Sequence, residues 1–171
     1  MKKTIILAIL FILLVSCAQN ENLDNYQTYD GADFSISYPS NWEFSIMEGG
    51  VFAFSSPQEN TDDAFIENLN VFAFELSQGA TLNDAINEGL VQLQQFLPEF
   101  NLISNKETTY LGMPAKELNY EAKAGESTLK FYQLATVKNN KLFTLTYVAE
   151  AQKYNNYLKQ FEKMINSFKI K

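Results

Sequence analysis

The chain has 171 residues, a formal net charge of −7 at pH 7, and lysine as its only basic residue type. An acidic chain without arginine lacks the clustered positive charge that nucleic-acid binding requires, so nucleic acid is not an expected partner. The absence of histidine and the presence of a single cysteine exclude Ser-His-Asp and Cys-His catalysis and zinc sites built on imidazole. The chain also has no glycine-rich phosphate loop of the Walker type, and we expect no cofactor.

The pattern of residues 1–16 predicts a cleaved signal peptide. A short basic start precedes an apolar run at residues 5–15. As a helix this run reaches ~16 Å, about half of the ~30 Å hydrocarbon core, so it is too short to span a membrane. Its end, Leu14-Val15-Ser16-Cys17, resembles the lipobox of bacterial lipoproteins. The resemblance implies cleavage between Ser16 and Cys17 and a diacylglycerol group on the Cys17 thioether. The alternative is an ordinary secretory signal that ends in cysteine.

Residues 17–32 predict a lipidated N-terminus and a flexible tether, because the segment is polar and lacks periodicity. Tyr26 and Tyr29 within it either dock onto the folded domain or stay loose. We expect the lipid on Cys17 to make the only membrane contact, since an acidic domain does not attract anionic head groups. Some lipoproteins carry an aspartate after the cysteine for retention at the inner membrane. Ala18 stands there instead, so the resemblance implies a protein of the outer membrane.

Residues 33–171 predict one folded domain that starts with short strands. Apolar and polar residues alternate at 34–38 and 42–46, which is typical of half-buried strands. The next strand is predicted at 51–55, after a glycine turn. A fourth strand is predicted at 69–76. It is apolar on both faces, which indicates a strand covered on both sides.

A polar loop with four carboxylates separates the last two of these strands. Glu59, Asp62 and Asp63 lie in the loop, and Glu67 follows shortly after. Carboxylate oxygens are the ligands that calcium prefers, but their spacing here does not match an EF-hand loop. The two interpretations are a cation site between Glu59 and Glu67 and an ordinary solvated loop.

Two helices are predicted, at residues 81–97 and 151–168. Thr81 and Asp84 have the spacing of a capping box at the start of the first helix. Gly89 lies in its middle, where glycine costs ~1 kcal/mol relative to alanine, and we expect close packing against a strand to explain it. Each helix has one apolar stripe. The stripes are Leu82, Ile86, Leu90, Leu93 and Leu97, and then Tyr154, Leu158, Phe161, Ile165 and Phe168.

Four more strands are predicted between the helices, at 102–110, 115–122, 129–137 and 142–149. The last two are apolar on both faces and are therefore expected at the centre of the sheet. Glu117, Asn119 and Glu121 share the outward face of the second one. Of all the carboxylates in the sequence, these most resemble the paired carboxylates of a hydrolase. The alternative interpretation is an ordinary solvated surface of the sheet.

The order of these elements resembles the PsbP family. The resemblance rests on Tyr38-Pro39-Ser40-Asn41-Trp42, on Asn68–Val71, on Leu111–Ala115, and on Leu142–Tyr147 followed by Phe161–Phe168. It covers about residues 33–169. The implied fold is α+β: an α/β/α sandwich of the Mog1/PsbP type, with a central antiparallel sheet of about six strands flanked by helices.

The resemblance implies little about activity. Plant members are extrinsic subunits of photosystem II, Mog1 binds a small GTPase, and bacterial members include many lipoproteins. We therefore expect a monomeric, lipid-anchored accessory protein of the cell envelope that acts by contact with another protein. The alternatives are a carboxylate-dependent hydrolase and a binder of a small hydrophobic ligand. Tyr38, Trp42 and Tyr110 lie near predicted turns and are candidates for a contact surface, with ordinary core positions as the alternative.

Overall fold

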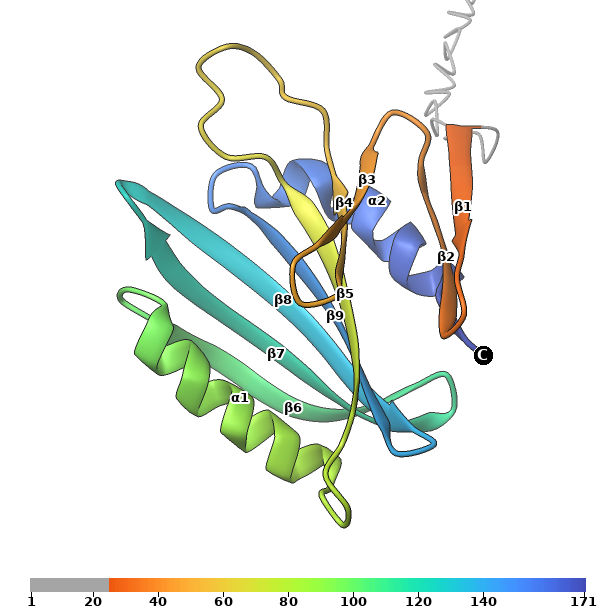
Figure 1. Cartoon of the computed structure of the whole chain (residues 1–171). Coiled ribbons are helices and arrows are strands. Elements are labelled where there is room, and N and C mark those ends of the chain that lie inside the picture. The colour runs from red at the N-terminus through yellow and green to blue at the C-terminus, as the bar shows by residue number, and fades with distance from the viewer. Residues whose placement is uncertain (1–24) are drawn as a thin grey trace, which may run out of the picture.

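The computed structural model describes residues 25–171, and its centre is a seven-stranded antiparallel sheet (Figure 1). The strand order is β3-β4-β5-β9-β8-β7-β6. The strand β9 is in the middle and β8 lies beside it, so the predicted centre of the sheet is confirmed. The strands are β3 (Glu43–Met47), β4 (Val51–Ser55), β5 (Asn68–Glu75), β6 (Asn101–Tyr110), β7 (Met113–Ala124), β8 (Ser127–Lys138) and β9 (Lys141–Glu150).

A smaller sheet has three strands in the order β1-β2-β10. These are β1 (Tyr26–Asp30), β2 (Phe34–Pro39) and β10 (Lys169–Ile170). The helix α2 (Tyr154–Ser167) contacts both β2 of this sheet and β9 of the large sheet. It therefore joins the two sheets, as Figure 1 shows.

The helix α1 (Leu82–Phe96) lies on the other face of the large sheet. Adjacent residues of a strand point to opposite faces. On β9, Leu142 packs in the cluster that contains α1, and Phe143 packs in the cluster that contains α2. The architecture is thus a helix–sheet–helix sandwich, and the predicted α+β fold with a large antiparallel sheet is confirmed. Within residues 25–171, neither helix combines the length and the apolar composition needed to cross a membrane.

The capping box predicted for the first helix is present. The Oγ1 of Thr81 accepts a hydrogen bond from the backbone N–H of Asp84 at 3.2 Å, and Asp84 Oδ2 accepts one from the N–H of Thr81 at 2.9 Å. These bonds satisfy donors that a helix start leaves without partners. The Thr81 hydroxyl also donates a hydrogen bond to Asp84 Oδ2 at 2.7 Å. This bond, together with the bond from the Thr81 N–H, holds the pKa of Asp84 below its usual value.

Aromatic rings fill the space between α2, the small sheet and the large sheet. Phe34, Phe54 and Tyr147 are each at most 1% exposed. Phe34 from the small sheet packs edge-on against Phe52 of the large sheet, with their ring centroids 4.9 Å apart. The chain contains no possible intrachain disulfide, so this core is the main source of its stability.

The folded part starts earlier than the sequence predicts. The strand β1 lies inside the segment 17–32 predicted as a tether, and it pairs with β2 along its whole length. Tyr29 explains why this segment is ordered. Its ring packs 5.1 Å from Phe34 and 4.8 Å from Phe44, so it docks onto the core. The predicted boundary at residue 33 is therefore wrong, because two tyrosines in a polar segment are enough to anchor a strand.

The prediction that β5 is covered on both sides is also wrong. Leu69 and Val71 are fully buried in the cluster that contains α2 and the small sheet, but Phe74 on the opposite face is 38% exposed. The helix α1 packs on β7 and β8 and does not extend over all of the β5 face. The expected close packing of Gly89 is absent for the same reason. A Cβ atom added to Gly89 would meet no atom within 4 Å.

Candidate functional site

A groove of about 740 Å³ lies between α1 and the face of the large sheet that α1 partly covers. The strands β5, β9, β8 and β7 form its floor, and α1 forms its wall. Most of the lining is apolar. Its large apolar side chains include Phe72 and Phe74 on β5, Leu118 on β7, Leu142 on β9, and Ile86, Leu93 and Phe96 on α1.

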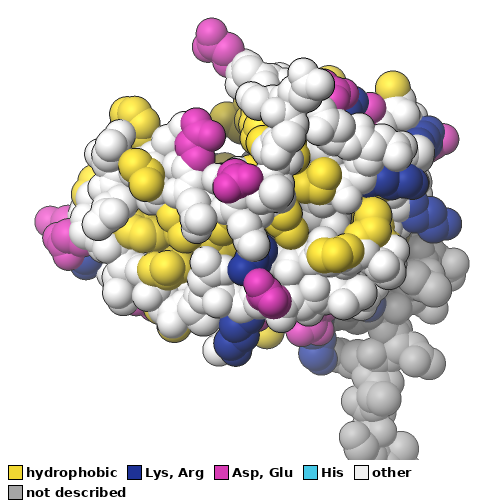
Figure 2. All heavy atoms as spheres, turned by 90° about the horizontal axis from the view of Figure 1, so that it is seen from below, with side chains coloured by type: hydrophobic (Ala, Val, Ile, Leu, Met, Phe, Trp, Pro, Cys, Tyr) yellow, Lys and Arg dark blue, Asp and Glu magenta, His cyan; other side chains and the backbone are white. Residues whose placement is uncertain are grey.

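Two phenylalanines leave much of their surface open at this groove. Phe96 at the end of α1 is 79% exposed, and Phe74 on β5 is 38% exposed. Figure 2 shows hydrophobic side chains gathered across the face seen from below, with acidic side chains among them. Exposed apolar patches of this kind mark surfaces that bind a protein, a membrane or a ligand. The groove is therefore the strongest candidate for a functional site among the described residues.

The charged groups of the groove are all acidic. Glu75, Asp84 and Glu88 line it, and its lining contains no lysine. It also contains no cysteine or tyrosine, and the whole chain has no histidine. The lining thus offers apolar area, carboxylates and a few amide and hydroxyl groups. This combination of apolar area with a few polar groups is typical of binding sites.

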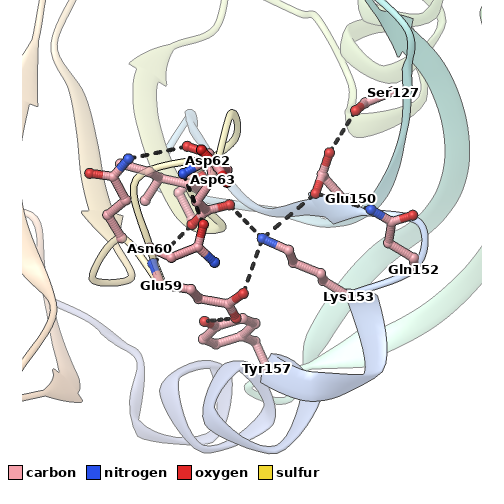
Figure 3. Close-up of polar contacts among 12 residues, drawn as sticks. Glu59, Asn60, Asp62, Asp63, Ser127, Glu150, Gln152, Lys153 and Tyr157 are labelled. Carbon is pink, nitrogen blue, oxygen red and sulfur yellow. Dashed lines mark hydrogen bonds and ion pairs between the residues drawn. The ribbon is translucent and has the colours of Figure 1, made fainter.

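The acidic loop between β4 and β5 is attached to the start of α2 through Lys153. The Nζ of Lys153 lies 3.2 Å from Glu59 Oε2, 2.5 Å from Asp63 Oδ1 and 3.7 Å from Glu150 Oε2 (Figure 3). These contacts, led by the hydrogen bond to Asp63, raise the pKa of Lys153 above its usual value. The Tyr157 hydroxyl donates a further hydrogen bond to Glu59 Oε1 at 2.8 Å.

These contacts bear on the cation site considered between Glu59 and Glu67. Within residues 25–171, no group of three or more His, Cys, Asp or Glu residues could hold a metal ion. The ammonium of Lys153 instead sits where the carboxylates of Glu59 and Asp63 converge. The loop therefore already has a cation partner from its own chain.

Glu67 is the unusual member of this region. Its side chain is 0% exposed, and neither carboxylate oxygen makes a hydrogen bond of good geometry. Burial raises the pKa of Glu67 above the usual value, and the charge of Lys153 only partly opposes this effect. The residue directly precedes β5, and its carbonyl accepts a hydrogen bond from the N–H of Ser56 at 2.8 Å. The backbone thus fixes this buried carboxyl beside the Lys153 cluster.

Two of the three aromatic residues considered for a contact surface are buried in the core. Tyr38 is 8% exposed and Trp42 is 4% exposed, and both belong to the core under α2. Tyr110 is partly buried, and its hydroxyl donates a hydrogen bond to the carbonyl of Ile165 at 2.6 Å. The contact-surface interpretation is therefore wrong for the buried Tyr38 and Trp42. For the partly buried Tyr110 it stays a prediction. The position of Tyr38 and Trp42 near turns is explained by packing between the small sheet, the large sheet and α2.

The carboxylates on β7 are not arranged as a catalytic pair. Glu117 accepts hydrogen bonds from the Tyr132 hydroxyl and from Asn119, both at 3.3 Å. Glu121 lies 3.7 Å from the ammonium of Lys130. Four residues along a strand correspond to ~13 Å, which exceeds the ~5–9.5 Å between paired carboxylates of glycosidases. The two glutamates thus belong to separate polar contacts on the sheet.

Cys17 and the preceding Ser16 lie outside the described residues, so the structure says nothing about the predicted lipidation site.

The sequence prediction missed the groove itself. Two signals for it are present in the sequence. One is Gly89 in the middle of α1, and the other is the outward-facing pair Phe72 and Phe74 on β5. From the sequence alone, both features indicate close packing between a helix and a strand. Only the structure shows that the space beside them is open.

The fold is of the Mog1/PsbP type. Residues 14–170 match the family model described as PsbP-like protein, and the chain therefore belongs to the PsbP-like family. No curated protein sequence matches the chain.

Several solved structures are similar to this chain. Cyanobacterial PsbP (CyanoP) from Synechocystis sp. PCC 6803 has a TM-score of 0.66 and 20% identity, over 92% of this chain and 99% of its own. LpqN, which is involved in cell envelope biogenesis of Mycobacterium tuberculosis, has a TM-score of 0.66 and 12% identity, over 85% and 90%. The Ran-binding protein Mog1p of Saccharomyces cerevisiae has a TM-score of 0.58 and 10% identity, over 85% and 95%. At these identities the similarity shows the fold alone.

Proposed function

We propose that this chain is a lipid-anchored accessory protein of the bacterial cell envelope. It acts as a monomer by contact with another envelope protein, and it does not catalyse a reaction. The lipobox-like Leu14–Cys17 supports the anchor. The similarity to LpqN, which is involved in cell envelope biogenesis, supports the location. Mog1p is a Ran-binding protein, so a domain of this fold can act by protein contact.

The observation that carries this proposal is the groove beside α1. It combines exposed apolar surface with acidic side chains. A tethered domain also searches the membrane surface for partners at a high effective concentration. A second candidate function is the binding of a small hydrophobic ligand in the same groove, because its volume of about 740 Å³ falls within the ~300–1,000 Å³ typical of ligand pockets.

Cross-linking from the groove in intact cells tests the proposal. A photo-reactive amino acid is placed in the full chain at the position of Phe96, which lines the groove, or at the position of Val91. Val91 is the matched control, because it is 55% exposed on α1 but does not line the groove. We expect position 96 to give a discrete cross-link to one envelope protein and position 91 to give none.

Two outcomes would contradict this proposed function. One is a cross-link to lipid alone, or equal cross-linking from both positions. The other is turnover in a broad screen of hydrolase and transferase substrates that Glu117→Gln removes without unfolding the protein. Such turnover would identify an enzyme that uses this carboxylate.

The anchor has its own test. Cys17→Ser is expected to abolish lipidation and to leave the precursor uncleaved by the lipoprotein peptidase, because the thioether cannot form on serine. The measurement is the incorporation of radiolabelled palmitate. Ser16→Ala is the control and should still be labelled, since it keeps a small residue before the cysteine. Equal labelling of Cys17→Ser and the natural sequence would show that the lipid is not on this residue. Fractionation of the labelled protein tests the outer-membrane location.

A further inference from the structure

The length and the charge of the groove beside α1 indicate which kind of molecule it can bind. Its wall is one face of α1 from Asp84 to Phe96, which corresponds to ~18 Å along the helix axis. This length matches about three turns of another helix. An amphipathic helix binds such a groove through apolar side chains spaced three and four residues apart. The groove thus has the dimensions of a helix-binding site.

The carboxylates of the groove differ in whether they already have partners. Asp84 is held by Thr81 in the capping box. Glu75 lies 3.6 Å from the ammonium of Lys141. Glu88 makes no hydrogen bond or ion pair with any residue in the described range 25–171, and it is exposed. It is therefore available to a cation that a partner brings, in a groove whose lining holds no lysine.

Gly89 lies next to Glu88, in the middle of this wall. Its backbone is α-helical and does not require glycine. A Cβ atom would meet nothing within 4 Å, so the packing of the chain on itself does not require glycine either. An interior glycine nevertheless costs ~1 kcal/mol of stability relative to alanine. Glycine allows close approach of another molecule to the backbone. The partner would therefore come closest to α1 at this residue.

We propose that this groove binds an amphipathic helix of a partner protein, which crosses α1 at Gly89 and places a lysine or arginine beside Glu88. The inference rests on the proposed protein-contact function and adds the chemistry of the partner segment. The apolar stripe of that helix covers Phe74 and Phe96, which the chain leaves exposed. The acidic groove disfavours an anionic occupant, because like charges would be brought together away from water.

The test uses the lipidated chain from Cys17 onward in nanodiscs of phosphatidylcholine, which carries no net charge. The probes are two fluorescent synthetic amphipathic helices with the same leucine stripe, one with lysine and one with glutamate beside the stripe. Binding is followed by fluorescence anisotropy, and empty nanodiscs give the background. We expect the lysine helix to bind at least tenfold more tightly than the glutamate helix. This preference should decrease as salt is added.

Two variants connect this binding to the groove. Gly89→Leu places a side chain in open space and replaces a poor helix former by a good one, so it should weaken binding of the lysine helix at least tenfold while the melting temperature holds or rises. Val91→Leu on the same helix is the matched control and should leave binding unchanged. Glu88→Gln should reduce the preference for the lysine helix severalfold.

Three results would overturn the inference. They are equal binding of both helices, unchanged binding of the lysine helix by Gly89→Leu, and binding of neither helix. The proposed function is tested separately by cross-linking from position 96. A discrete cross-link to an envelope protein together with any of these three results would keep the protein-contact function and reject the amphipathic helix as its partner segment.

Discussion

Replacing Phe161 by alanine is expected to lower the free energy of unfolding by ~3–5 kcal/mol, a large part of the stability of an ordinary domain. Phe161 lies in the middle of the buried stripe of α2 and is 2% exposed. Its ring stacks on Tyr147 of β9, with centroids 4.7 Å apart, and packs edge-on against Tyr132 of β8 at 5.2 Å. Alanine would remove these contacts and leave a cavity between α2 and the sheet.

Chemical denaturation of the natural and mutant chains measures this loss. Phe96→Ala provides the matched control, because Phe96 is also a helical phenylalanine but is 79% exposed. Its replacement should change the free energy of unfolding by no more than ~0.5 kcal/mol. A melting temperature of Phe161→Ala within a degree or two of the natural chain would show that α2 does not pack on β8 and β9 as described.

The regular elements of the fold could be predicted because their periodicity depends on burial alone. The stripe of α2 repeats every three to four residues and does bury Phe161 and Ile165. The strands at the centre of the sheet were predicted from apolar residues on both faces, and β9 is the middle strand. The capping box of Thr81 and Asp84 was also predicted correctly, since it involves only residues within one turn.

The candidate site could not be predicted, because it depends on where helices stop covering the sheet. Phe74 and Leu69 are both apolar residues of β5, yet Leu69 is fully buried and Phe74 is 38% exposed. A sequence pattern cannot show that α1 packs on β7 and β8 rather than directly over β5. The aromatic residues illustrate the same limit. Trp42 lies near a turn and appears in sequence as a possible contact residue, but the small sheet and α2 bury it.

Glu67→Gln is expected to raise the free energy of unfolding at neutral pH by ~1–3 kcal/mol, because burial penalises the charged carboxylate and glutamine carries no charge. Glu67 is completely buried, and its carboxylate oxygens lack hydrogen bonds of good geometry. The positive charge nearby belongs to Lys153, which already contacts Glu59, Asp63 and Glu150. A fourth negative charge near this one ammonium is therefore poorly compensated.

The contribution of Glu67 to the stability of the folded chain changes with pH. Burial raises the pKa of Glu67 in the folded chain above its usual value of 4.5. The folded state therefore keeps a proton that the unfolded state releases as the pH rises above about 4.5. Stability from this group is greatest below that pH and is lost as the pH rises through the folded-state pKa. Tyr147 and Tyr157 interact electrostatically with Glu67, but burial raises their pKa values and they do not ionise in this range.

Denaturation of the natural chain and of Glu67→Gln across pH 4 to 8 measures the difference directly. Carboxylates with lowered pKa values, such as Glu59 and Asp63, destabilise both chains as the pH falls, and this contribution cancels when the two chains are compared. The advantage of the glutamine variant should be small near pH 4 and should grow as the pH rises. Glu126→Gln, at an exposed turn between β7 and β8, removes the same charge and should give a difference within ~0.5 kcal/mol at every pH. A Glu67→Gln chain less stable than the natural one at neutral pH would mean that the charged carboxylate is stabilised by Lys153 more than burial penalises it.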